Sequence, residues 1–468
     1  MCGTKVVCAE GDCGACTVLV GRPDGAQATA KANSNVTYVP VNGCIQYMYQ
    51  LDGASVITVE ALSPSEGSPA QSAMVDNNGT QCGYCTPGFI MSLSALAYCP
   101  SMAVSENKSA PTACQVKSAL TGNLCRCTGY ESIVKAGVEC QYKEFKPLSE
   151  VIDEPTVNAA LAKLNQDDVL VQHGERQFYL GDSVDDLSRY MSDNQGTVLV
   201  SGGTDVSVVM NKRGFAPVSI ASTARLPGLS NIEIIEEDGK KVLVAGGRAS
   251  LYALEKFCLA QNDAHLQEFY RILWVFGSPQ IRQAGTLAGN IANGSPIADS
   301  LPMLMACDAQ IEASSHRGVR RIALREFYLG YKKLALALDE IITRIFIPIP
   351  DASEILKLYK VSRREHLDIS SFTAALRIAV DKAGKISKAR VILGGVDATV
   401  HSIPDAESAL VGQPHTLQTY QKAGKIAAAS IKPLTDVRGS SDFRAQLAEN
   451  IFSKFYHESK ELQLEAAK

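Results

Sequence analysis

The sequence predicts a multidomain α+β protein, and three observations support this fold class. The chain has 468 residues, which is too long for one ordinary hydrophobic core and indicates about three domains. Its first part contains two groups of closely spaced cysteines, and the second group lies among helical segments. From about residue 176 onward, apolar strand-like runs alternate with helical segments. We therefore expect small cysteine-rich domains followed by larger mixed domains.

Composition limits the expected partners and location. Apolar residues make up 46% of the chain, charged residues make up 20%, and the formal net charge is -4. This balance is typical of a soluble globular protein without the basic excess that binds phosphate backbones, so we expect no nucleic acid partner. No apolar run approaches the ~20 residues that cross a bilayer, and the first residues lack a signal-peptide segment. We expect a cytoplasmic protein with no membrane contact. Disulfides are rare in that reducing compartment, so clustered cysteines indicate metal or redox chemistry.

The first cysteine group begins with the sequence CAEGDCGAC. Cys8, Cys13 and Cys16 have the spacing C-x4-C-x2-C, and Cys44 follows after 27 residues. This is the plant-type ferredoxin spacing for a [2Fe–2S] cluster. The glycines of the loop suit a backbone that folds tightly around a cluster. Zinc and unligated thiols are the alternatives, although structural zinc sites usually add a second C-x2-C or histidines. These four residues are called cysteine group I.

The second cysteine group consists of two pairs. Cys82 and Cys85 form a C-x2-C pair, and Cys125 and Cys127 form a C-x-C pair 39 residues later. Four thiolates are enough for another [2Fe–2S] cluster. The alternative for the C-R-C pair is an ordinary surface loop. These four residues are called cysteine group II.

Four helices are expected around group II. Pro87 suits a first helical position, and both cysteine pairs lie in turns that lead into helices. Helix N-termini offer free N–H groups and a positive dipole end to thiolates. The predicted helices are 68–79, 88–97, 113–120 and 130–140.

The next segment reads as a connection between domains. Residues 142–172 are rich in charge and lack a clear apolar period, so we expect an interdomain linker there. Helix and strand patterns follow it. The predicted helices are 183–191 and 251–261, and the predicted strands are 197–200 and 241–244.

Two glycine-containing stretches in the second part could bind phosphate. In VLVSGGTDV, residues 198–206, an apolar strand opens into Gly202 and Gly203, whose backbone N–H groups can face a pyrophosphate. A Gly-Gly turn after a strand is by itself usually only a turn. The second stretch, GTLAGNIANGSPIAD at 285–299, is rich in small hydrogen-bonding groups and strengthens the hypothesis. No G-x-G occurs in the chain, so the Rossmann fingerprint and the Walker loop are both absent.

Taken together, the two cysteine groups resemble the iron–sulfur half of the molybdenum hydroxylases, the xanthine dehydrogenase and aldehyde oxidase family. The resemblance covers residues 8 to about 146 and includes QCGYCTPGFIMS and GNLCRCTGY. It implies a β-grasp ferredoxin domain that holds one [2Fe–2S] cluster through group I, next to a flavin. It also implies a four-helix domain that holds a second cluster through group II, next to the molybdenum cofactor. The family's ferredoxin domain begins with a strand hairpin and a helix, whereas seven residues precede Cys8 here. Either the start of the chain is assigned too late, or the ferredoxin domain is N-terminally shortened and its cluster is less well shielded from water; whether the shortened domain retains its cluster is open. The stretch SVITVEAL, residues 55–62, reads as the strand that leaves this domain.

The second part resembles the family's flavin domain, which has the vanillyl-alcohol-oxidase type of FAD-binding fold. The match runs from about residue 178 to 350, and a small α/β C-terminal domain follows, with a strand in KARVILGGV and a helix at 417–430. The resemblance implies that the two glycine stretches hold the FAD pyrophosphate and ribose and that YKVSRREHLDISS approaches the isoalloxazine ring. Without the resemblance, YKVSRRE would read as an exposed strand end with solvated charges. The implied FAD residues are Leu199, Val200, Ser201, Gly202, Gly203, Thr204, Asp205, Val206, Thr286, Gly289, Asn290, Asn293, Asp299, Lys360 and Ile369.

The resemblance also divides the chain. We expect a plant-type [2Fe–2S] ferredoxin domain at 1–62, a helical [2Fe–2S] domain at 63–146 and a linker at 147–175. An FAD-binding domain at 176–350 and a C-terminal flavoprotein domain at 355–464 complete the expected organisation.

The function implied by the resemblance is electron transfer in a xanthine dehydrogenase-like oxidoreductase of purine metabolism. Electrons would pass from molybdopterin on a separate large subunit through both clusters to FAD and on to NAD+. No catalytic residue is expected on this chain, and a heterotetramer of two small and two large subunits is implied. The alternatives are the same role in another aldehyde or heterocycle hydroxylase, an NADH-linked iron–sulfur flavoprotein reductase, and a zinc-binding scaffold without catalysis.

Overall fold

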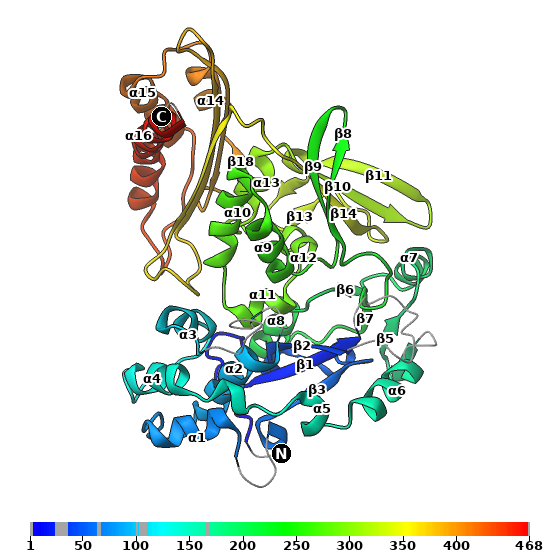
Figure 1. Ribbon diagram of the computed structural model, residues 1–468. Helices are drawn as coiled ribbons and strands as arrows, with labels where there is room; N and C mark the ends of the chain where they lie inside the picture. Colours follow the sequence, from blue (N-terminus) through cyan, green and yellow to red (C-terminus); the bar gives the residue numbers. More distant parts are fainter. Residues whose placement is uncertain are drawn as a thin grey trace. The chain divides into compact units, whose positions relative to one another are not determined.

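The computed structural model describes residues 3–23, 36–62, 67–99, 102, 110–164 and 169–466. The chain folds into two compact units (Figure 1). The N-terminal unit contains Met1–Ser230, Ser250–Tyr252 and Gly277–Thr286. The C-terminal unit contains Asn231–Ala249, Ala253–Phe276 and Leu287–Lys468. None of the described helices is both long and apolar enough to cross a membrane.

The N-terminal unit begins with a three-stranded antiparallel sheet in the order β2-β1-β3. The strands are β1 (Thr17–Pro23), β2 (Val36–Asn42) and β3 (Ser55–Ile57), and the short 3₁₀ helix η1 (Gly43–Ile45) follows β2. The prediction of a strand over 55–62 was right only for its first half, because Val59–Leu62 forms the 3₁₀ helix η3. Val59 and Leu62 are both buried, and residues three apart share one side of such a helix.

Four helices follow, as the sequence predicts. They are α1 (Pro69–Asp76), α2 (Thr86–Tyr98), α3 (Ala113–Ala119) and α4 (Glu131–Glu139). Ser68 caps α1 through the N–H of Gln71, and Thr112 caps α3 through the N–H of Gln115. Helix α2 is buried along most of its length and forms the centre of this helical core.

The rest of the N-terminal unit is a second, mixed sheet in the order β4-β5-β7-β6. Strand β7 pairs in parallel with both β5 and β6, whereas β4 and β5 are antiparallel. The predicted helix at 183–191 and strand at 197–200 are confirmed as α7 and β6, and the predicted linker 147–175 contains α5, α6 and β4. The elements are α5 (Leu148–Val151), α6 (Glu154–Leu164), β4 (Val169–His173), β5 (Arg176–Leu180), α7 (Val184–Asp193), β6 (Val198–Val200), α8 (Val206–Arg213), β7 (Ser219–Ser222) and α11 (Pro279–Ala284).

The C-terminal unit contains a five-stranded antiparallel sheet in the order β11-β10-β14-β9-β8, with a small antiparallel pair, β12 and β13. The predicted strand 241–244 is confirmed within β9, and the predicted helix 251–261 is α9. The strands are β8 (Ile232–Glu237), β9 (Lys240–Gly246), β10 (Gln310–Ser315), β11 (Gly318–Ala323), β12 (Tyr328–Gly330), β13 (Lys333–Leu334) and β14 (Ile341–Pro348). The helices are α9 (Leu251–Ala260), α10 (Ala264–Trp274), α12 (Leu287–Asn293) and α13 (Leu301–Ala306), and the 3₁₀ helix η5 covers Leu324–Glu326.

The last part of the C-terminal unit is an antiparallel sheet, β15-β16-β17-β18, packed against three helices (Figure 1). The predicted strand in 388–396 and helix at 417–430 are confirmed within β17 and as α15. The elements are β15 (Ile355–Val361), β16 (Phe372–Val380), β17 (Ile386–Gly394), β18 (His401–Ser402), α14 (Pro404–Leu410), α15 (Leu417–Ala429) and α16 (Ser441–Ala466).

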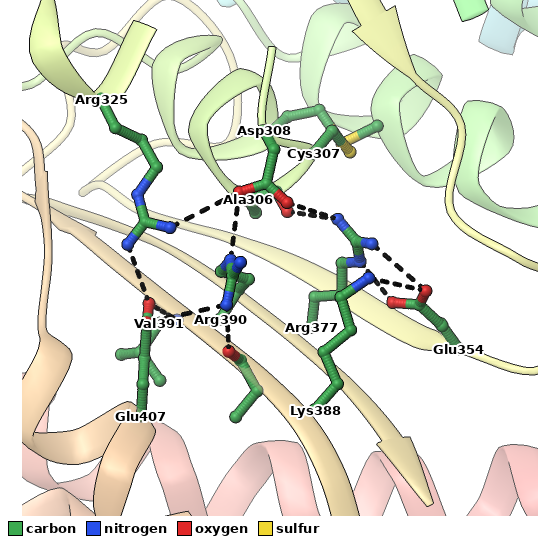
Figure 2. Close-up of polar contacts among 12 residues, drawn as sticks. Ala306, Cys307, Asp308, Arg325, Glu354, Arg377, Lys388, Arg390, Val391 and Glu407 are labelled. Carbon is green, nitrogen blue, oxygen red and sulfur yellow. Dashed lines mark hydrogen bonds and ion pairs between the residues drawn. The ribbon is translucent and has the colours of Figure 1, made fainter. Parts of the chain in front are cut away.

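An ion network joins the five-stranded-sheet part of this unit to the last sheet (Figure 2). Glu354 and Arg377 are buried and lie 2.5 Å apart, and Lys388 also contacts Glu354 at 3.0 Å. Although burial raises the pKa of Glu354, the hydrogen bond from Arg377 and the nearby charges lower it below its usual value. Asp308 forms ion pairs with Arg377, Arg390 and Arg325. Glu407 forms ion pairs with Arg325 and Arg390. Arg377 Nη1 also donates a hydrogen bond to the carbonyl oxygen of Ala306.

His415, which lies just before α15, should make the stability of the C-terminal unit depend on pH. Its Nδ1 lies 2.9 Å from Tyr420 Oη and its Nε2 3.4 Å from Ser459 Oγ. Burial, together with the charge of Lys460, lowers the pKa of His415 to about 4. The unfolded chain therefore binds more protons between pH 6.5 and pH 4, and stability falls as pH falls through that window. We expect a loss of about 2 kcal/mol between pH 7.5 and pH 5. The free energy of unfolding, measured with denaturant at pH 7.5 and at pH 5, tests this expectation.

The His415→Gln variant should lose that pH dependence. The control is His457→Gln, which removes an exposed histidine from α16. Equal pH slopes in the two variants would contradict the assignment to His415.

Candidate metal and cofactor sites

Strand pairing brings the cysteines of group I together in the N-terminal unit. Thr17 of β1 pairs with Asn42 of β2, so Cys16, just before β1, lies beside Cys44, just after β2. The N–H of Gly43 donates to the carbonyl oxygen of Cys16 at 3.1 Å. The loop between Cys8 and Cys16 is fixed by Asn42, whose Nδ2 donates to the carbonyl oxygen of Gly11 at 2.7 Å.

The four thiols of group I share hydrogen bonds. A hydrogen bond with Cys44, followed by burial, raises the pKa of Cys8 to about 12. Cys16 raises the pKa of Cys44 to about 11, and Cys44 in turn lowers the pKa of Cys16. Burial raises the pKa of Cys13, which also contacts Cys8. The four thiols are therefore linked in pairs, Cys13 with Cys8, Cys8 with Cys44 and Cys44 with Cys16, so they are neighbours in space.

Group II gathers in the same way at the start of two helices. Cys85 precedes α2, where Thr86 and Pro87 take the first helical positions, and its sulfur hydrogen-bonds with Cys125. Cys127 hydrogen-bonds with Cys82, and this contact raises the pKa of Cys127. Burial and the contact with Cys125 raise the pKa of Cys85 to about 12. The two pairs are thus brought together from segments 39 residues apart in the chain.

Cys125 is surrounded by hydrogen-bond donors. Thr128 Oγ1 donates to its sulfur at 3.2 Å, and the N–H of Cys127 donates at 3.4 Å. Although burial raises the pKa of Cys125, the hydrogen bonds from Thr128, Cys127 and Cys85 together lower it below its usual value. The N–H of Cys125 donates to Tyr130 Oη at 3.0 Å. Donors of this kind stabilise thiolate charge.

A buried polar contact holds the two cysteine loops against each other. The N–H of Leu124 donates to the carbonyl oxygen of Cys13 at 2.9 Å, and Asn123 Nδ2 donates to that of Gly14 at 3.1 Å. Gln280 Nε2 donates to Asn123 Oδ1 at 3.1 Å and to Ser92 Oγ at 3.2 Å. The sequence alone did not indicate Asn123, Ser92 or Gln280. A serine within the apolar run of α2 was the one available signal.

The sulfur contacts within groups I and II have the pairing that a [2Fe–2S] cluster requires. Such a cluster divides four cysteines between two irons, so it needs neighbouring pairs of thiolates. Contacts between sulfur atoms occur in both groups. Among the residues that the structure describes, no group of three or more His, Cys, Asp or Glu side chains is arranged to hold a metal ion.

Nine of the expected FAD residues lie in the N-terminal unit. Leu199 and Val200 end β6, and the loop from Ser201 leads to Asp205 at the N-cap position of α8. A Cβ on Gly202 would overlap the carbonyl oxygen of Ala284, and Gly203 has φ +71°. The buried hydroxyl of Ser201 has no hydrogen-bond partner within the described residues. A polar loop with a buried hydroxyl lacking a partner fits a phosphate-bearing cofactor. The ninth residue, Thr286, is buried and pairs with Ser250.

The other six lie in the C-terminal unit. Gly289, Asn290 and Asn293 are on α12, where Ser300 Oγ donates to Asn290 Oδ1 at 2.6 Å and Lys332 Nζ donates to Asn293 Oδ1 at 3.3 Å. Ile369 is exposed.

Lys360 and Asp299 form a buried ion pair in that unit. Their charged atoms are 2.7 Å apart, and the side chains are 4% and 9% exposed. Ser370 Oγ donates to the other oxygen of Asp299 at 2.5 Å, and Lys360 Nζ also donates to the carbonyl oxygen of Val275 at 3.0 Å. The alternative interpretation of this strand end as a set of solvated charges is therefore wrong for Lys360.

Three family models match the chain. They are described as a [2Fe-2S] binding domain at residues 58–137, an FAD binding domain in molybdopterin dehydrogenase at 174–350, and a CO dehydrogenase flavoprotein C-terminal domain at 357–459. The predicted fold class is confirmed by these matches.

Curated relatives include xanthine dehydrogenases. The chain is 28% identical to xanthine dehydrogenase 1 of Arabidopsis thaliana over 97% of this chain and 37% of the relative. It is 28% identical to the xanthine dehydrogenase of Emericella nidulans over 97% of this chain and 36% of the relative. The chain thus spans little more than a third of the length of these relatives.

Solved structures with a similar fold include two carbon monoxide dehydrogenases. The enzyme of Hydrogenophaga pseudoflava matches with TM-score 0.55 and 24% identity, over 59% of this chain and 94% of that chain. Reconstituted CO dehydrogenase from Oligotropha carboxidovorans matches with TM-score 0.55 and 25% identity, over 61% of this chain and 97% of that chain.

Proposed function

We propose that this chain is an iron–sulfur and FAD subunit of the molybdenum hydroxylase family and that it transfers electrons in a xanthine dehydrogenase-like oxidoreductase, which the family models and the similarity to xanthine dehydrogenases support. It takes electrons from a molybdopterin-bearing partner subunit and passes them through two [2Fe–2S] clusters and FAD to NAD+. The observation that carries the proposal is the convergence of two complete four-cysteine groups in one compact unit, with their loops in direct contact.

The proposed cofactors are held by the residues predicted from the sequence. Group I and group II hold one cluster each. The residues that bind FAD are Leu199 to Val206, Thr286, Gly289, Asn290, Asn293, Asp299, Lys360 and Ile369. When bound, the clusters supply one-electron transfer and FAD joins it to two-electron chemistry. The protein keeps the thiolates paired, donates hydrogen bonds to Cys125 and buries the Lys360–Asp299 pair.

The domain boundaries, the assembly and the location are part of the same proposal. The boundaries are 1–62, 63–146, 147–175, 176–350 and 355–464, which the ranges of the three family models support. The partner is a large subunit in a heterotetramer, and the cysteine use suits a reducing cytoplasm. A second candidate is the same role in a hydroxylase of another substrate, which the CO dehydrogenase flavoprotein model favours.

The first experiment is a count of iron, acid-labile sulfide and flavin on the purified protein, with its visible spectrum. Four irons, four sulfides and one FAD per chain are expected. Two irons would mean that only one cysteine group binds a cluster, and colourless protein with zinc would overturn the proposal. NADH added to the isolated chain tests the acceptor, because bleaching of the flavin is expected if NAD+ is its partner.

The hydroxyl of Thr128 should raise the reduction potential of the cluster of group II. The Thr128→Val variant removes the O–H bond to Cys125 without changing the side-chain shape. Hydrogen bonds to sulfur stabilise the more negative reduced state, so its reduction potential should fall by about 50 mV. A redox titration followed by electron paramagnetic resonance measures it. The control is Thr80→Val, whose hydroxyl pairs with Thr86 at 2.6 Å instead of a sulfur atom. Equal potentials in both variants would count against this role of Thr128.

A further inference from the structure

Helix α8 of the N-terminal unit connects the expected flavin loop to cysteine group I. Its N-cap is Asp205, the end of the loop that contains Gly202 and Gly203. Its last turn lies beside η1, which contains Cys44. One short helix thus contacts a metal-binding loop at one end and continues from the cofactor loop at the other.

The side chain of Asn211 in the last turn makes three hydrogen bonds to the segments that carry group I. Its Oδ1 accepts from Tyr47 Oη at 2.6 Å. Its Nδ2 donates to the carbonyl oxygen of Ala9 at 3.0 Å and to that of Cys44 at 2.9 Å. One carboxamide therefore joins the residue after Cys8 to Cys44, two parts of group I that are far apart in sequence.

The backbone that Asn211 holds is conformationally costly. Ala9 has φ +55°, a left-handed conformation that is unfavourable for a residue with a Cβ. Such a conformation persists when neighbouring contacts fix it, and the bond to the carbonyl oxygen of Ala9 is one of them. The adjacent Lys212 forms an ion pair with Glu10 at 3.3 Å, on the same loop.

The segment after Cys44 also contacts the other end of α8. Gln50 is buried, and its Nε2 donates to the carbonyl oxygen of Gly202 at 3.3 Å. Its Oε1 accepts from Ser207 Oγ at 3.3 Å. The backbone from Cys44 to Gln50 is thereby tied to both ends of the helix, so a change at either end reaches the group I loop.

We propose that Asn211 is a positioning residue for the cluster of group I. Its carboxamide fixes the backbone at Ala9 and Cys44 and so sets the directions of the N–H groups and the solvent access around the group I sulfurs. Both factors set the reduction potential of an iron–sulfur cluster. This inference rests on the proposed function, because it assumes that group I binds a cluster.

Two substitutions of Asn211 test whether the residue positions the group I backbone or is needed only for folding. Asn211→Asp keeps the shape and the acceptor for Tyr47, but it cannot donate and turns a carboxylate toward two carbonyl oxygens. Asn211→Ala removes all three bonds without adding charge. Since Asn211 is exposed, water can replace these bonds, but it does not fix the backbone direction. Both variants should therefore fold and bind iron.

The test is a redox titration of the whole FAD-loaded protein, followed by electron paramagnetic resonance of both iron–sulfur signals. The cluster of group II serves as an internal reference. The control is Asn194→Asp, which makes the same change of charge at a residue that bonds Gln177 and Tyr190. In Asn211→Asp, the ratio of reduced to oxidised group I cluster at a fixed potential should fall at least threefold. The ratio of reduced to oxidised group II cluster in Asn211→Asp should equal that in the Asn194→Asp control. Asn211→Ala should alter the line shape of the group I signal.

The outcomes distinguish the two claims. Wild-type protein with both signals, but no shift of the group I signal in either Asn211 variant, overturns the inference alone. Equal shifts of both signals in Asn211→Asp overturn it as well, because they indicate a general charge effect. Wild-type protein without a group I signal overturns the inference together with the two-cluster part of the proposed function.

Discussion

Replacing Cys44 by alanine removes two of the four expected irons, and replacing Cys85 by alanine removes the other two. Each [2Fe–2S] cluster requires all four thiolates, so the loss of one is expected to release both irons of that cluster. The sulfur of Cys44 contacts Cys8 and Cys16, whereas that of Cys85 contacts Cys125, so the two losses are independent. Iron and sulfide counts together with electron paramagnetic resonance measure them, and one signal should disappear in each variant.

The flavin provides the matched readout. None of the expected FAD residues belongs to group I or group II, so one FAD per chain should remain in both variants. The control Cys114→Ala removes an exposed cysteine of α3 that belongs to neither group, and it should keep four irons. Retention of four irons in Cys44→Ala would show that group I does not hold a cluster.

Substituting alanine for Gly88 should destabilise the N-terminal unit strongly. A Cβ on Gly88 would overlap the carbonyl oxygen of Gly14 and lie 3.0 Å from Cα of Ala15. These are backbone atoms that cannot rotate away, and Gly14 is itself fixed by bonds from Asn123 and Thr17. Overpacking of this kind costs about 3 kcal/mol, more than the gain in helix propensity returns. The midpoint of thermal unfolding should fall by about 6–12 °C, with a loss of iron from both groups.

Ser94→Ala in the same helix is the control for Gly88→Ala. Ser94 is fully buried and its hydroxyl has no hydrogen-bond partner in the part of the chain that the structure describes. Its removal should leave the midpoint unchanged or raise it. If the midpoint of thermal unfolding were equal in Gly88→Ala and Ser94→Ala, the backbone at Gly14 would be able to move away from α2 without a loss of stability.

Local signals explain what the sequence predicted well. The spacing of the cysteines reflects ligand chemistry, and the helices around group II have caps at Ser68 and Thr112 that involve residues three positions away. Such patterns are visible within a few residues. The three-stranded sheet was predicted less well, because the burial of Val59 and Leu62 decides against a strand only once the core is formed.

Contacts between residues far apart in the chain explain which structural features could not be predicted from the sequence. Gln280 reaches Ser92 and Asn123 across sequence separations of 188 and 157 residues, which no local pattern encodes. Lys360 looked like a solvated charge because its partner Asp299 is 61 residues away. Helix α16 was not predicted, although Ala448, Ile451, Phe452 and Phe455 have helical spacing and are buried. The FAD residues came from resemblance, and their roles stay predictions.

The ion network of the C-terminal unit limits how this part of the chain can be exchanged with that of a relative. Asp308 and Arg325 lie within the segment that matches the FAD binding model, whereas Arg377, Lys388, Arg390 and Glu407 lie within the segment that matches the C-terminal model (Figure 2). A chimera joined near residue 350 would pair one parent's carboxylates with the other parent's guanidinium groups. The contacts that such a junction divides are those of Asp308 and Arg325, whose side chains are 39% and 27% exposed, so each lost ion pair costs up to about 1 kcal/mol. The buried Glu354–Arg377 pair stays within one parent. A chimera should therefore take Asp308 and Arg325 from the same parent as Arg377, Arg390 and Glu407.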